Sequence, residues 1–155
     1  MKAAVVIATV AAASLCAMAA QAQDADVIRE VGVEARDVIF ANISSFQCDA
    51  VPCAAATAEE LANPPVTDDE AAAIAATAVI SAMGEHCGLD WNRQSYLPMM
   101  QDWMSRPGMA VRTSALVGGM HGYVQEQALR SFRSQGDCDD QTRAAVQAAL
   151  DQNRD

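Results

Sequence analysis

Apolar residues recur at helical spacing along most of this chain, and the alternation typical of strands is almost absent. Between residues 26 and 45 the apolar side chains fall three, four or eight positions apart, which predicts a helix with one buried face. They are Val27, Val31, Ala35, Val38 and Phe46. The same periodicity predicts helices over 67–86, 95–105 and 109–134, and a last helix after Gly136. We therefore expect an all-α fold, a small bundle of four to five helices.

Capping signals mark where these helices begin and end. Residues 67–70 (Thr-Asp-Asp-Glu) form a capping box, with threonine as the N-cap and glutamate three positions later. Gly84 and Gly88 are both candidate ends for the helix that starts there. The segment 47–65 carries two cysteines and three prolines, so we expect a stapled loop with a single capped helical turn at 57–60.

The first 22 residues have the organisation of a secretory signal peptide. Lys2 supplies a positive charge, residues 3–19 form an apolar stretch, and residues 20–22 (Ala-Gln-Ala) match an A-x-A cleavage site. We expect cleavage there, delivery to the periplasm or secretion, and one helical domain over 23–155. One alternative is an uncleaved membrane anchor, although the apolar run is near the short end of the roughly 17–25 residues that a span needs. Another is lipidation of Cys16, which the bulky leucine before it disfavours.

The net charge of the mature chain excludes some classes of binding partner. Its nine arginines and twenty acidic residues give a formal charge of −11, which repels nucleic acid and anionic lipid. The only lysine is Lys2, so the mature chain has none for Schiff-base chemistry or for a P-loop. The longest uncharged stretch, 71–84, has 14 residues and is too short to cross a bilayer. We expect no nucleic-acid binding and no membrane insertion after cleavage.

Four cysteines follow the leader, and this even number indicates two disulfides in an oxidising compartment. Three pairings are open. We predict Cys48–Cys53, which are five residues apart, and Cys87–Cys138, which would join the ends of two predicted helices. Closing the longer loop stabilises the fold by about 4 kcal/mol in the chain-entropy model.

Three glycines lie in the middle of the predicted helix 109–134, at Gly118, Gly119 and Gly122. Each costs roughly 1 kcal/mol relative to alanine in a helix interior. We therefore expect something to compensate: a close helix crossing, a kink, or a bound group that touches the backbone.

His121 lies among these glycines and is the residue that we expect in any functional pocket. Two interpretations are open. In the structural one, which we favour, its imidazole is buried and hydrogen-bonded across a helix crossing. In the functional one it contacts a ligand or partner together with Met120, Tyr123 and Arg112.

Methionine is the one compositional anomaly, because all six methionines of the mature chain fall between positions 83 and 120. Thioether and imidazole ligands select Cu(I), and the periplasm is a plausible place for such a site. The candidate ligands are Met99, Met100, Met104, His86 and His121. The alternative is an ordinary core stripe or an adaptable protein-binding surface, since methionine fills irregular gaps.

Catalytic motifs do not stand out in this sequence. We find no zinc-protease H-E-x-x-H, no G-x-S-x-G elbow and no glycine-rich phosphate loop. His86 and Cys87 are adjacent, but neighbours on a helix point in different directions and an exported cysteine is normally oxidised. The sequence favours a non-catalytic protein, without a cofactor, that binds another periplasmic or envelope protein as an adaptor, chaperone-like factor or inhibitor. Copper binding is the second class of function, and an enzyme with an unrecognised site is the third.

Overall fold

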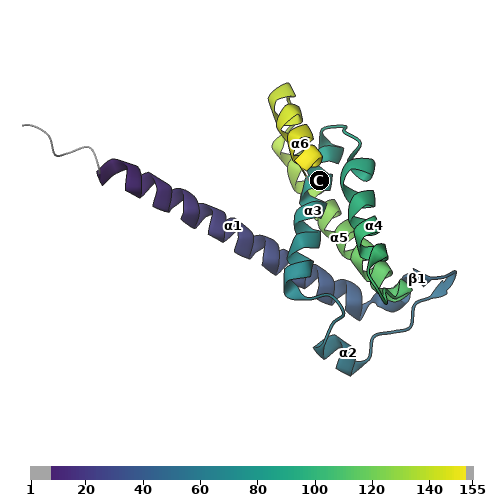
Figure 1. The fold of residues 1–155 in the computed structure, drawn as a ribbon. Helices are drawn as coiled ribbons and strands as arrows, with labels where there is room; N and C mark the ends of the chain where they lie inside the picture. The colour runs from purple at the N-terminus through teal and green to yellow at the C-terminus, as the bar shows by residue number, and fades with distance from the viewer. Residues whose placement is uncertain (1–7, 153–155) are drawn as a thin grey trace, which may run out of the picture.

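The computed structural model describes the backbone of residues 8–152 and the side chains of residues 25–152. Residues 1–7 of the predicted signal peptide lie outside this range. Within it are six α-helices, a bundle from which the first helix extends (Figure 1). They are α1 (Ala8–Ala41), α2 (Ala58–Ala62), α3 (Asp68–His86), α4 (Leu97–Ser105), α5 (Val111–Gln135) and α6 (Asp140–Gln152). The expected count of four to five was too low, because the short α2 forms a helix of its own.

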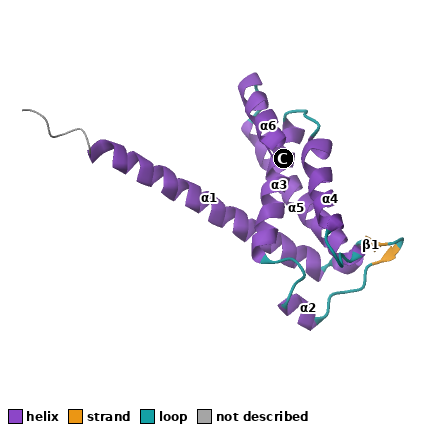
Figure 2. Ribbon diagram, in the orientation of Figure 1, coloured by secondary structure: helices purple, strands orange, loops and turns teal. Residues whose placement is uncertain are grey.

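Three smaller elements complete the described fold. A 3-10 turn, η1 (Ile43–Ser45), follows α1, and a π-helical turn, η2 (Asn92–Tyr96), precedes α4. Two strands of two residues each, β1 (Gln47–Cys48) and β2 (Val51–Pro52), pair antiparallel as a hairpin at one edge of the bundle (Figure 2).

The helix α3 is the central element and packs against α1, α5 and α6. Its inner face is mostly alanine, and Ala71, Ala75 and Ala78 are all fully buried. Such small side chains let a neighbouring helix approach closely. Gly32 on α1 completes this crossing, since an added Cβ would overlap the carbonyl of Ala71. We had not singled out Gly32 from the sequence.

Both capping signals are confirmed. Thr67 caps α3 by accepting a hydrogen bond from the backbone of Glu70, and Thr57 caps α2 in the same way. At the other end of α3, the N–H of Leu89 donates to the carbonyl of Gly84, and Gly88 has a φ of +67°. This is a Schellman ending, in which glycine takes the left-handed position at lowest cost. Of the two candidate glycines, Gly88 rather than Gly84 therefore ends α3.

A buried arginine ties α1 to the start of α3. Arg36 is 7% exposed and donates to the carbonyl of Val66 at 3.2 Å. Its guanidinium also donates to Asp37 at 2.9 Å and to Asp68 at 2.5 Å. These charge-assisted bonds satisfy the buried guanidinium, which would otherwise be very costly to remove from water.

The predicted cleavage site lies inside α1, which is one continuous helix of 34 residues rather than a helix that begins near Asp26. Its N-terminal part runs away from the bundle, and its C-terminal part crosses α3 (Figure 1). In the part of the chain that the structure describes, no helix combines the length and apolar character needed to cross a membrane. Cleavage itself stays a prediction.

Both predicted disulfides are confirmed. Cys48 and Cys53 are bonded with their Cα atoms 4.9 Å apart, and Cys87 and Cys138 with theirs 5.1 Å apart. The second bridge joins the end of α3 to the segment before α6 and belongs to a small apolar cluster that includes Val146 and Leu150. This cluster is separate from the main core and holds α6 on the bundle.

Candidate binding groove

An open groove with a volume of about 550 Å³ lies beside the glycines of α5. This size is within the usual range of roughly 300–1,000 Å³ for ligand pockets. The floor is α5, one side is Tyr96 of η2, and the other side is formed by α1 and the hairpin. The lining residues are Ile39, Phe46, Gln47, Tyr96, Ser114, Ala115, Gly118, Gly119, Gly122 and Tyr123. None of these side chains carries a charge.

The three glycines play different parts in the groove. A Cβ on Gly119 would lie 2.8 Å from side-chain atoms of both Ile39 and Phe46, so only glycine permits this close approach. A Cβ on Gly118 would lie 3.3 Å from the hydroxyl of Tyr96. Gly122 is exposed, and an added Cβ would meet nothing within 4 Å. A close helix crossing, one of the three expected compensations, is therefore present at Gly119 but not at Gly122, where the missing side chain leaves open space.

His121 lies behind this floor and is 1% exposed. Its Nε2 lies 2.9 Å from the hydroxyl of Ser81 on α3. That hydroxyl donates to Ser95 at 2.9 Å, and Ser95 donates to the carbonyl of Thr77 at 3.4 Å. Burial lowers the pKa of His121 to about 4, so the imidazole is neutral at neutral pH.

The direction of these hydrogen bonds bears on catalysis. If Ser81 gives its single proton to Ser95, it receives one from Nε2–H of His121, and the ring is then a donor rather than a base. Both serines have no exposed surface. Without exposed surface, neither hydroxyl has the access to a substrate that a serine nucleophile needs.

Tyr96 links the buried cluster to the groove. Its ring centroid lies 4.8 Å from that of His121, and the tyrosine also lines the groove. Trp91 also stacks on His121, with ring centroids 6.2 Å apart and planes inclined by 19°, and its ring lies 6.4 Å from that of Tyr96. Sequence periodicity suggested neither Tyr96 nor Ser95, because the π-helical turn that positions them has no simple sequence signal.

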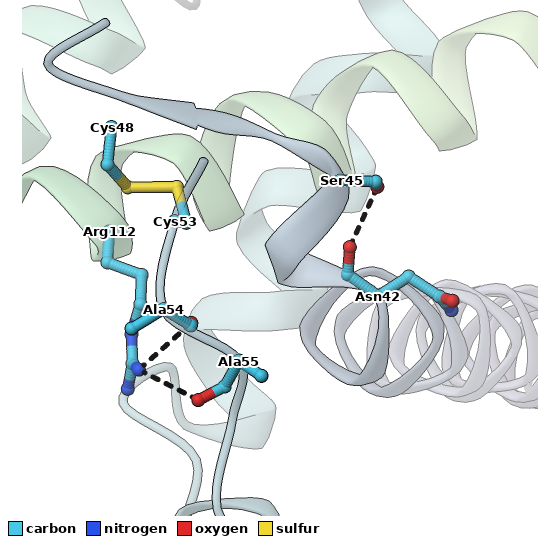
Figure 3. The surroundings of a disulfide bond; sticks show 7 residues. All are labelled: Asn42, Ser45, Cys48, Cys53, Ala54, Ala55 and Arg112. Atoms are coloured by element: carbon cyan, nitrogen blue, oxygen red, sulfur yellow. Dashed lines mark hydrogen bonds between the residues drawn. A yellow bond between two sulfur atoms is a disulfide. The ribbon is translucent and has the colours of Figure 1, made fainter. Parts of the chain in front are cut away.

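Arg112, a predicted partner contact, is engaged within the protein. Its guanidinium donates to the carbonyls of Ala54 and Ala55 at 3.3 and 3.5 Å (Figure 3) and forms an ion pair with Glu60. Hydrogen bonds from Thr57 and from Arg112 lower the pKa of the Glu60 carboxyl. Arg112 thus tethers the loop that follows the hairpin.

The other predicted contacts are divided between core and groove. Met120 is fully buried, whereas Tyr123 lines the groove. Of the predicted partner-contact set, the structure therefore brings only Tyr123 to the accessible surface of the groove.

The candidate copper ligands are spread over several parts of the molecule. Met99 and Met100 pack against the main core, and Met104 is 64% exposed. His86 packs against Phe132, with ring centroids 6.3 Å apart, while His121 belongs to the serine cluster. Among the described side chains, no group of three or more His, Cys, Asp or Glu residues could hold a metal ion. Copper binding through methionine stays a prediction.

Comparisons with family models, with curated protein sequences and with solved structures found no match for this chain. Any function must therefore be argued from the site itself.

Proposed function

We propose that this chain is an exported, non-catalytic protein that binds an uncharged segment of another envelope protein in the groove along α5. The observation that carries the proposal is the open space over Gly122, beside which Phe46, Tyr96 and Tyr123 line the groove. A floor without side chains lets a partner's backbone approach closely. Tyrosine and phenylalanine are enriched in protein interfaces.

The charge of the groove favours this kind of partner. The mature chain carries −11, yet all ten groove residues are uncharged. An apolar or neutral polar segment enters such a groove without leaving a buried charge unpaired. Gln47, Ser114 and the two tyrosines supply hydrogen-bonding groups at its edges.

Export is supported by the two disulfides, because such bridges persist in oxidising compartments. We propose cleavage after Ala22 and a periplasmic location. N-terminal sequencing of the protein from a periplasmic fraction tests this directly, and the expected first residue is Gln23. Recovery of the chain with its leader intact contradicts it.

Two substitutions at one position test the groove. Gly122→Leu fills the open space, whereas Gly122→Ala adds only a methyl group that meets nothing within 4 Å. Both variants should melt at or above the wild-type temperature, because glycine is the poorest of the three in a helix. Only the leucine variant should lose partner binding.

Binding can be measured before the partner is known. A photo-crosslinking amino acid is introduced in place of Ser114, which lines the groove. The control carries the same amino acid in place of Gln127, which is exposed on α5 outside the groove. We expect a discrete adduct from position 114 alone, reduced by about tenfold or more by Gly122→Leu and unchanged by Gly122→Ala. Equal adducts from both positions, or no effect of leucine, contradict the proposal.

A further inference from the structure

The hairpin beside the groove is held in an unfavourable backbone conformation. Asp49 and Ala50 form its turn with φ values of +51° and +66°. Two-residue turns of this kind normally use Asn-Gly or Asp-Gly, because a Cβ is disfavoured in the left-handed region. Here alanine occupies the position that favours glycine.

Few hydrogen bonds hold this turn in place. The paired residues are Gln47 with Pro52 and Cys48 with Val51, and in this antiparallel ladder only the second pair is of the hydrogen-bonded kind. The base of the hairpin is closed by the N–H of Cys53, which donates to the carbonyl of Phe46 at 2.9 Å. The Cys48–Cys53 disulfide adds a covalent constraint to this short ladder.

The two arms of the hairpin differ in how they are anchored. Cys53 is 3% exposed, and the next two carbonyls are held by Arg112 (Figure 3). The other arm leads from Cys48 back to Gln47 and Phe46, which line the groove. The groove arm is held by the packing of Phe46 and Cys48 against the core, so opening the bridge removes its covalent tie to the arm that Arg112 holds.

We propose that Cys48–Cys53 is a redox-sensitive latch that shapes the groove, and that an exported dithiol reductant opens it selectively. A thiolate of the reductant attacks the sulfur of Cys48, the partly exposed member of the pair, and Cys53 leaves as a thiolate. The second thiol of the reductant then resolves the mixed disulfide. Two cysteine thiols and one oxidised reductant result, so atoms and electrons balance.

Selectivity follows from the backbone at the two bridges. Opening Cys48–Cys53 lets Ala50 leave the left-handed region, and this relief favours reduction. At Cys87–Cys138 the neighbouring left-handed residue is Gly88, which has no Cβ and no such strain to release. Strained bridges are the more easily reduced ones.

The test uses the mature protein, graded dithiothreitol and alkylation of the freed thiols before peptide mapping. We expect Cys48 and Cys53 to be alkylated at a reductant concentration about tenfold lower than Cys87 and Cys138. Ala50→Gly is the matched variant, because it keeps the bridge and removes the strain. It should raise the reductant concentration needed at the first bridge about fivefold and leave the second unchanged. Simultaneous opening of both bridges, or no effect of glycine, overturns the proposal.

Amide hydrogen exchange of the selectively reduced protein tests the coupling to the groove. Residues 46–48 and 118–119 should exchange faster, while α3 keeps its protection. Unchanged exchange at the groove overturns the latch. The functional role of the latch rests on the proposed binding, but these measurements need no partner. If the bridge opens selectively and Gly122→Leu still binds normally, the binding proposal fails and the latch stands.

Discussion

Acidification should weaken this fold through His121. In the unfolded chain a histidine has a pKa near 6.5, while burial lowers the pKa of His121 to about 4 in the folded protein. Below pH 6.5 the imidazole of His121 therefore binds a proton in the unfolded state, while in the folded state it stays neutral until the pH is much lower. The stability that neutral His121 contributes is fully present above pH 6.5 and is lost as the pH falls towards 4. At 1.36 kcal/mol per pKa unit, the loss is about 3 kcal/mol.

Urea unfolding at several pH values from about 7 to about 4 measures this effect, with His121→Gln as the control. Glutamine does not titrate, and its amide can still donate to Ser81. The two proteins differ only at residue 121, so the difference between them reports on His121 alone. We expect the free energy of unfolding of the wild type to fall relative to the variant by about 3 kcal/mol over this range.

The shape of the difference decides the matter. If the difference in unfolding free energy between wild type and His121→Gln is the same at every pH, the imidazole has the same pKa in the folded and unfolded states. The inference of a buried, neutral histidine is then wrong. NMR titration of the folded protein gives an independent check. The ring signals of His121 should stay in the neutral position down to about pH 5.

Four other outcomes follow from the packing. Replacing Cys87 and Cys138 by serine should cost about 4 kcal/mol in a thermal or urea melt, because the closed loop is long. Gly32→Ala should cost at least 1–3 kcal/mol, since its Cβ would lie 2.8 Å from a backbone nitrogen of α3; a wild-type melt contradicts that crossing. Gly122→Ala should instead stabilise by about 1 kcal/mol, and a loss of stability shows that its space is filled. Arg36→Met should destabilise by about 1–3 kcal/mol, because the carbonyl of Val66 loses its buried donor; a neutral result removes the arginine as an anchor.

Local signals in the sequence determined the helices and most of their ends. The capping boxes at Thr57 and Thr67 depend on residues three positions apart, so a single sequence displays both partners. The end of α5 is also a local signal, because it falls at Gly136, which has a φ of +122°. The disulfide pairing was also predicted, since Cys48 and Cys53 are close in the sequence and Cys87 and Cys138 follow or precede predicted helices.

Only the tertiary structure decided what each glycine does. Gly119 and Gly122 occur in the same short motif, but Gly119 contacts Ile39 and Phe46 from distant parts of the chain, while Gly122 faces open space. Gly32 lies alone in the sequence and gives no local signal, yet it allows the close approach of α1 to the backbone of α3. The purpose of a missing side chain depends on the neighbour that occupies its space.

The groove and the buried serine–histidine cluster are each formed by residues from several elements. Ser81, Ser95 and His121 lie on three different elements, so no spacing along the chain relates them. Tyr96 reaches both the cluster and the groove because a π-helical turn changes the direction of its side chain before α4. Periodicity describes one element at a time, whereas a site built from several elements exists only after their packing is fixed.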